Sequence, residues 1–175
     1  MKKFVQKVLR LLMTPLRRNY QRRNGCHPTE ERREMPNEVL LGLARDMIRE
    51  GHTAVINVKG YSMRPFLEHC RDKVKLAPAT DLSVGDAILA EIQPGLFVLH
   101  RIIRIEGDTI TMMGDGNIRG TEQCRRGDVC GIVTEYIRPG RIIPATDPTL
   151  CRRIRTWRKL LPVRRWLLII YKSII

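Results

Sequence analysis

The stretch of sequence that decides the fold is LFVLHRIIRIEGDTITMM, residues 96–113. Two runs of mostly apolar, β-branched residues flank the polar triplet Glu106-Gly107-Asp108. Such runs on either side of a glycine-containing turn predict two antiparallel strands joined as a hairpin. The imidazole of His100 interrupts the apolar character of the first run, so this residue needs either a buried partner or a function.

Four further runs around this hairpin have the same β character. They are TAVINVKG (53–60), DKVKLAP (72–78), DAILAEI (86–92) and DVCGIVTEYI (128–137). Turn residues separate them, for example Ser83-Val84-Gly85-Asp86. The core is therefore predicted to be mainly β.

A helix is predicted in front of the first strand. Asn37 suits its N-cap, Gly51 suits its end after about Glu50, and the apolar positions recur at helical spacing. These positions are Leu40, Leu43, Ala44, Met47 and Ile48.

The charge of +14 is concentrated in two arms. Residues 1–34 carry ten Lys/Arg against three Glu, and residues 138–175 carry ten against one Asp, whereas the middle carries 12 against 14. We therefore divide the chain into a basic amphipathic arm and linker (1–36), a core (37–138) and a basic amphipathic C-terminal arm (139–175).

The C-terminal arm alternates basic residues with large aliphatic ones, and Pro162 divides it. Both tryptophans, Trp157 and Trp166, lie in it beside arginines. This composition is typical of a helix that lies on an anionic membrane surface. The same pattern also suits a helix packed on the protein's own core or on a partner. We do not expect nucleic acid as a partner, because alternating aliphatic residues suit lipid better than phosphate tracking.

No apolar stretch reaches the roughly 18 residues that span a bilayer. The N-terminus starts like a secretory signal, but Lys7 and Arg10 interrupt its apolar region and no small-residue cleavage site follows. We expect a mature chain at the cytoplasmic side, attached peripherally to the membrane, because both arms are strongly positive.

The five cysteines give no metal-ligand spacing. Cys26-His27 and His69-Cys70 are adjacent pairs, and no two cysteines form a C-x-x-C motif. Structural zinc sites usually draw on more widely spaced pairs of ligands. We expect free thiols, no metal and no cofactor.

The segment VKGYSMRPFLEHC, residues 58–70, places Ser62 directly after a strand-like run. A serine there is either a turn residue or a nucleophile held at the edge of a sheet. A serine nucleophile needs a base to take its proton and a group that orients the base. His100 is the best-placed base, because the other histidines lie in the linker, at a helix end or in the serine's own segment.

The orienting group is predicted in MMGDGNIRG, residues 112–120. Asp115 lies there between two glycines, past the end of the hairpin that carries His100. Its carboxylate is predicted to lie near the imidazole and hold it. Gly-Asp-Gly-Asn also makes an ordinary turn, and a histidine in a strand is often only a buried residue with a partner.

In this order the motifs resemble the signal-peptidase-like serine peptidases, a superfamily that includes the self-cleaving repressors of the SOS response. The matching pieces are Gly-x-Ser-Met-x-Pro, Val-Gly-Asp, apolar-His-Arg-Ile-Ile and Gly-Asp-Gly-Asn, within residues 55–133. A histidine at the place of His100 resembles the endoplasmic-reticulum, archaeal and spore-former branch, since the common bacterial enzymes have lysine there.

The resemblance implies a fold and three catalytic roles. The fold is a coiled antiparallel sheet or partly open barrel, preceded by one helix and flanked by the two arms. Ser62 would be the nucleophile, His100 the general base and Asp115 the residue that orients His100. Asp72 and Asp86 match two further aspartate-containing turns that look structural.

Gly60 stands where common bacterial signal peptidases have a hydroxyl-bearing residue that helps the oxyanion hole. The hole would then rely on backbone N–H groups around Ser62 and Met63. Gly60 would let the substrate backbone approach closely.

The sequence thus predicts a serine endopeptidase that trims leader or signal segments of exported peptides at a membrane surface. Its partners would be a peptide or protein carrying such a segment and the anionic membrane. One alternative is a binding module on a peptidase fold without catalysis. The other is a self-processing, repressor-type regulator, for which the 36 residues before the first core helix are few.

Overall fold

Eight antiparallel strands form one open sheet in the computed structural model, which describes residues 36–174. The sheet has the order β1-β2-β7-β3-β4-β5-β6, and β8 pairs with β7 beside this path. The strands are β1 (Ala54–Asn57), β2 (Lys73–Ala77), β3 (Ala87–Gln93), β4 (Leu96–Glu106), β5 (Thr109–Met113), β6 (Glu122–Arg125), β7 (Val129–Arg138) and β8 (Arg141–Pro144). A short 3-10 turn, η2 (Arg126–Asp128), joins β6 to β7. The mainly β, antiparallel core is confirmed.

The predicted hairpin is strands β4 and β5, with Gly107 at φ +57° in its turn. Glu106 pairs with Thr109, and the register runs regularly until a bulge between Ile102 and Arg104. Beyond that bulge Arg101 pairs with Met113. The bulge therefore shifts the pairing of the far half of the hairpin by one residue.

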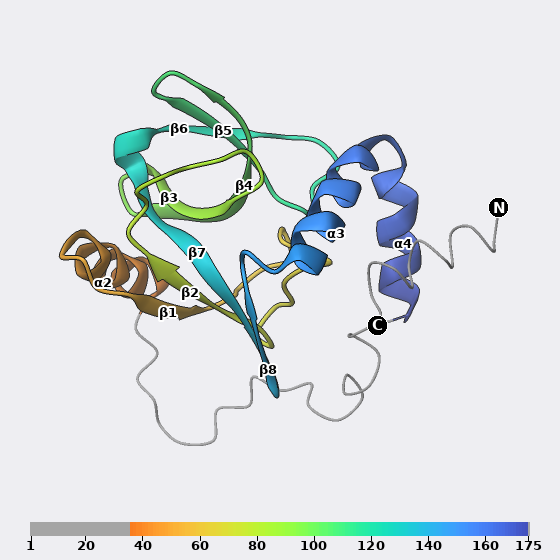
Figure 1. The fold of residues 1–175 in the computed structure, drawn as a ribbon, viewed down its shortest axis with the longest axis horizontal. Coiled ribbons are helices and arrows are strands. Elements are labelled where there is room, and N and C mark those ends of the chain that lie inside the picture. Colours follow the sequence, from red (N-terminus) through yellow and green to blue (C-terminus); the bar gives the residue numbers. More distant parts are fainter. Residues whose placement is uncertain (1–35, 175) are drawn as a thin grey trace.

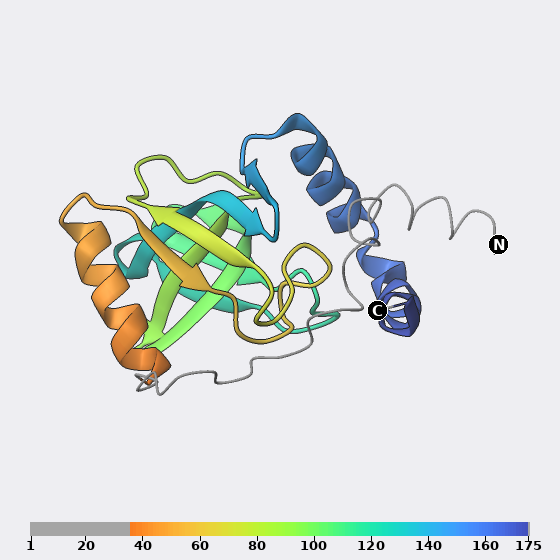
Figure 2. The ribbon, with the colours of Figure 1, turned by 90° about the horizontal axis from the view of Figure 1, so that it is seen from below.

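Helix α2 (Asn37–Arg49) packs beside β1 at one end of the sheet (Figures 1 and 2). Its extent agrees with the prediction, but its cap does not: Pro36 occupies the N-cap position and no side chain caps the helix. Asn37 is the first helical residue, and Pro36 before it keeps an extended backbone, with φ −50° and ψ 139°. Of the predicted apolar face, only Ala44 and Ile48 are buried.

The two faces of the sheet carry two apolar clusters. The larger cluster joins α2, β1, β2 and the segment after β1 to the C-terminal helices. The smaller cluster lies on the other face of β3, β4 and β5 and is centred on Ile88, Ile102 and Met112. Alternation along β4 assigns His100 and Ile102 to this smaller cluster's face and Arg101 to the larger cluster's face.

The C-terminal arm forms α3 (Pro148–Lys159), a 3-10 turn η3 (Leu161–Val163) that contains Pro162, and α4 (Arg164–Ile174). Asp147 caps α3 by accepting from the Leu150 N–H. These helices lie at the end of the molecule opposite α2 (Figure 2).

The apolar side of α3 faces the protein itself. Leu150 and Ile154 are buried, and Trp157 is only 2% exposed. The expectation that Trp157 sits at a lipid interface is therefore wrong, because its ring fills the core beside Phe66. Trp166 differs, since it is 66% exposed on α4.

Within residues 36–174, no helix has the length and apolar character needed to cross a membrane. The N-terminal arm and linker, residues 1–35, lie outside the described part of the chain, and the expectations for them stay predictions.

Candidate functional site

Ser62 lies in a closed segment between β1 and β2. Two backbone hydrogen bonds pin its base: the Val58 N–H donates to the Asp72 carbonyl at 3.0 Å, and the Cys70 N–H donates to the Val58 carbonyl at 2.8 Å. Gly60 enters the segment at φ +94°, a conformation that favours glycine. Open space surrounds the position of a Cβ at Gly60, so the backbone angle rather than crowding selects this residue. Ser62 itself is half-buried.

Buried charged side chains stabilise the Ser62 segment. The Glu68 carboxylate is 2% exposed, accepts from Arg64 at 2.9 Å and also accepts from the Tyr171 hydroxyl. Burial, followed by the bond to Glu68, raises the pKa of Tyr171 above its usual range, so the phenol is the donor. The Asp72 carboxylate, fully buried, accepts from the Glu68 N–H and from Arg71. Asp72 is structural, as expected.

The loop of residues 114–116 packs directly against Ser62. The Gly116 N–H donates to the Ser62 carbonyl at 2.6 Å. A Cβ at Gly114 would lie 2.5 Å from that carbonyl oxygen, and one at Gly116 would lie 2.7 Å from the Tyr61 carbonyl oxygen. Both glycines are therefore needed for this close approach of the loop to the Ser62 segment.

His100 is buried, and its carboxylate partner is Glu122. The ring Nδ1 lies 2.8 Å from the Glu122 carboxylate, with the two side chains 7% and 30% exposed. An ionised carboxylate only accepts, so Nδ1 carries the proton. The neutral ring then has Nε2 as its basic nitrogen, the arrangement that a general base requires.

Asp115 does not contact His100, contrary to the prediction. Its carboxylate accepts from the Arg101 guanidinium at 2.6 to 3.0 Å, in a pair whose side chains are 3% and 1% exposed. Burial alone would lower the pKa of Arg101, but the charges of Asp115 and Tyr136 and the hydrogen bonds to both together outweigh it, so the pKa lies above its usual range. The Asp115 carbonyl accepts from the Trp157 indole at 2.8 Å.

The bulge in the hairpin explains this exchange of partners. An uninterrupted register from the Gly107 turn would set Asp115 opposite His100. The bulge shifts the pairing, so continuing the register of Arg101 with Met113 sets Gly114 opposite His100 instead. Asp115 then shares the face of Arg101.

Glu122 shares the face of His100 because its cross-strand partner, Met112, pairs with Ile102 in turn. Cross-strand partners project to the same face of a sheet. Gly114, which has no side chain, lies between His100 and Glu122. We infer that the His100 side chain passes over Gly114 to reach Glu122 in β6. The Ser62 carbonyl occupies the space where a Gly114 side chain would project, so the Ser62 backbone adjoins the same spot.

Ser62 and the His100–Glu122 pair thus lie beside the same loop, residues 114–116, but are not joined in the described part of the chain. No hydrogen bond between residues 36 and 174 links the Ser62 hydroxyl to His100. The backbone N–H groups of Ser62 and Met63 also donate to no acceptor there, while the Met63 side chain is buried.

Two residues of this site were not predicted from the sequence, Glu122 and Arg101. Arg101 follows His100 in an apolar run, where a second charge is as unusual as the first, and this was a usable signal. Glu122 stands in the polar run TEQCRR, where nothing distinguishes it. Asp86 accepts from the Ser83 N–H and closes the predicted turn, a structural role as expected.

His69, the other histidine near Ser62, already has a hydrogen-bond partner. His69 accepts the Gly60 N–H at Nδ1 and lies beside the Tyr61 ring. In the searched residues, no group of three or more His, Cys, Asp or Glu side chains is arranged to hold a metal ion. Comparison of the chain with protein-family models, curated proteins and solved structures finds no match.

Proposed function

We propose that this chain is a serine endopeptidase with a signal-peptidase-like core. The observation that carries the proposal is the buried His100, with Nδ1 held by Glu122 at 2.8 Å, next to the loop on which Ser62 is packed. The marked curl of strands β3 to β6 in Figure 1 supports the coiled, partly open form of such a core.

Ser62 is the nucleophile in this mechanism. Its Oγ attacks the carbonyl carbon of the scissile peptide bond while Nε2 of His100 takes the hydroxyl proton. His100 then gives that proton to the leaving amine as the C–N bond breaks, which leaves an acyl-serine. In the second half His100 takes a proton from a water molecule as the water oxygen attacks the ester carbon. His100 then returns this proton to Ser62 Oγ as the C–Oγ bond breaks and the acid product leaves.

Glu122 takes the role first expected of Asp115. It keeps the proton on Nδ1 and stabilises the imidazolium that forms in each half-reaction. The oxyanion of each tetrahedral intermediate is bound by the free N–H groups of Ser62 and Met63, a contribution of about 10²–10³ in rate per donor in other proteases. Asp115 acts on the loop rather than on the base.

The substrate is an extended peptide that adds to the edge of the sheet. Strand β1 is an edge strand and leads within five residues into Ser62, so a peptide paired with β1 would run toward the nucleophile. The resemblance stated above adds leader or signal segments with small residues before the cut. The exposed Trp166 and Ile169 on the basic helix α4 support work at a membrane surface.

The test uses the purified full chain with lipid or detergent and a mixed library of leader-like peptides. Wild type is compared with Ser62→Ala, His100→Ala and two matched controls, Ser83→Ala and His52→Ala, which alter exposed residues of the same types. Mass spectrometry reads the products.

We expect cleavage by wild type and both controls, and none by Ser62→Ala or His100→Ala. Cleavage that survives Ser62→Ala would refute the mechanism. A library left intact by every protein, in detergent and in lipid, would favour a binding module that has the fold without the activity.

A further inference from the structure

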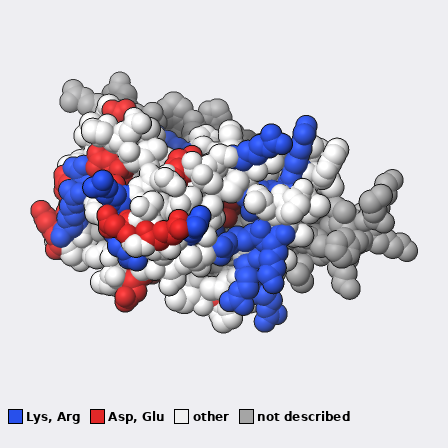
Figure 3. Space-filling view, turned by 90° about the horizontal axis from the view of Figure 1, so that it is seen from above, with Lys and Arg blue, Asp and Glu red and all other residues white. Residues whose placement is uncertain are grey.

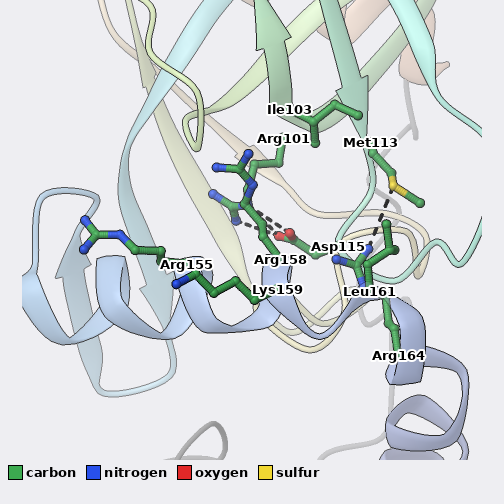
Figure 4. Close-up of a pocket in the computed structure, with 9 residues that line it drawn as sticks. All are labelled: Arg101, Ile103, Met113, Asp115, Arg155, Arg158, Lys159, Leu161 and Arg164. Atoms are coloured by element: carbon green, nitrogen blue, oxygen red, sulfur yellow. Dashed lines mark hydrogen bonds and ion pairs between the residues drawn. The ribbon is translucent and has the colours of Figure 1, made fainter.

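A basic pocket lies on the opposite side of strand β4 from His100. It has a volume of about 380 Å³ and opens between the β4–β5 hairpin and the corner formed by α3, η3 and α4 (Figure 4). Five basic residues and one acidic residue line it: Arg101, Arg155, Arg158, Lys159, Arg164 and Asp115. Their formal charges sum to +4.

The Arg101–Asp115 pair is balanced internally, so the other four cations determine the character of the pocket. In residues 36–174, none of these four makes an ion pair with a carboxylate. Arg155, Arg158 and Lys159 stand at i, i+3 and i+4 on α3, a spacing that sets them along one side of the helix. Lys and Arg side chains crowd over this helical end of the molecule in Figure 3, whereas most Asp and Glu side chains in that view lie toward the other end.

Arg164 is the best evidence that the pocket is built for an anion. It is 3% exposed, donates to the Asn117 carbonyl at 2.9 Å and lies over the Trp157 ring, which fixes the guanidinium. Its Nε–H, buried as well, donates to no acceptor among residues 36–174. Burial lowers the pKa of Arg164, and the nearby charge of Asp115 offsets only part of this effect.

A buried cation that makes no ion pair is unfavourable, and an anion in the pocket would relieve this cost. Phosphate suits the site better than a single carboxylate, because its several oxygens match several convergent guanidinium groups. The volume also exceeds that of one phosphate and leaves room for a small group attached to it. Leu161 lines the rim at 39% exposed, and Val163 follows it at 45%.

We propose that this pocket binds a phosphate group, either free or in the head group of an anionic phospholipid. The two sources share the phosphate, and the apolar rim provides contact for a lipid's glycerol and acyl region. The site is independent of the peptidase proposal, since it uses the other face of β4.

Two triple variants test it in the full chain. The first is Arg155→Gln, Arg158→Gln and Lys159→Gln, which empties the pocket wall of its mobile charges. The second is the control, Arg152→Gln, Arg165→Gln and Lys172→Gln, which removes the same charge from exposed residues of the same helices that do not line the pocket. A third variant, Arg164→Lys, keeps the buried charge but removes the Nε–H. Thermal melting confirms that each variant is folded.

One arm titrates inorganic phosphate and glycerol 3-phosphate by calorimetry at constant ionic strength. The other arm measures sedimentation with vesicles of phosphatidylglycerol in phosphatidylcholine, against phosphatidylcholine alone. We expect binding in at least one arm that weakens by about 10-fold or more in the pocket triple variant and stays near wild type in the control. Binding of the soluble probes would identify free phosphate as a ligand, and binding of vesicles alone would identify the lipid head group.

Two results would overturn the proposal. One is the absence of binding in both arms. The other is an equal loss in the two triple variants, which would mean that diffuse charge on the helices, and not this pocket, attracts the anion. The three α3 residues changed in the pocket variant lie at or near the surface. We therefore expect this variant to fold, so that its binding reports on the pocket.

Discussion

The neighbouring residues His100 and Arg101 project to opposite faces of strand β4, and each has a carboxylate partner. The Arg101–Asp115 pair is almost completely buried, with several hydrogen bonds and a further contact of Arg101 to the Gly85 carbonyl at 2.7 Å. The His100–Glu122 pair has one hydrogen bond, and its carboxylate is 30% exposed. A pair sealed in this way holds structure together, whereas a pair open on one side can exchange protons with a substrate and with water.

The largest effect is expected from breaking the buried pair. Asp115→Asn leaves the Arg101 charge buried without a counter-charge, which should lower the free energy of unfolding by about 3–5 kcal/mol. Urea denaturation measures the loss. Glu106→Gln is the matched control in the same hairpin, because the exposed Arg104–Glu106 pair should contribute little. Equal losses in the two variants would contradict the structural role of Asp115.

The His100–Glu122 pair should respond in the opposite way, with a large loss of activity and a small change in stability. Glu122→Gln keeps the shape of the side chain but removes the charge that orients His100 and stabilises its protonated form. Peptide cleavage should fall by about 10²-fold or more, while stability changes little because the carboxylate is already partly solvated. Cleavage rates and urea midpoints are measured on the same preparations. A stability loss as large as that of Asp115→Asn, with cleavage unchanged, would reverse the assignment of roles.

The smallest expected effect comes from Gly114, which separates the two pairs. A methyl group there meets the Ser62 carbonyl oxygen at 2.5 Å, and backbone cannot yield as a flexible side chain would. Gly114→Ala should therefore cost about 1–3 kcal/mol of stability and displace Ser62, with a loss of cleavage. Gly127→Ala is the control, since no atom lies within 4 Å of its Cβ position. Normal cleavage by Gly114→Ala would show that the packing of Ser62 on this loop does not matter.

Sequence patterns predicted the long strands, the hairpin and the extent of α2, because alternation, glycine turns and helical spacing are local signals. Strands β6 and β8 were missed. Each has four residues, one run is polar and the other ends in proline, so their pairing with β5 and β7 rather than their own pattern makes them strands.

In the candidate site, too, some features follow from local sequence signals and others depend on tertiary structure. The need of His100 for a polar partner was predictable, because an imidazole stands out in an apolar run. The partner of His100 was not, because a bulge of one residue in β4 decides whether Asp115 or Gly114 stands opposite it. The amphipathic pattern of a helix is the same whether its apolar side faces lipid or the core of the protein. Whether Trp157 is buried therefore depends on tertiary packing.

The bond between Tyr171 and Glu68 has a consequence for the newborn chain. During synthesis the Ser62 segment leaves the ribosome long before α4 does, and domains generally fold as units once their parts are available. Until Tyr171 reaches Glu68, and Trp157 reaches the Asp115 carbonyl, the Ser62 segment and the loop beside it lack these two hydrogen bonds. The final packing of the Ser62 segment therefore depends on a residue that is 103 positions later in the chain than Glu68.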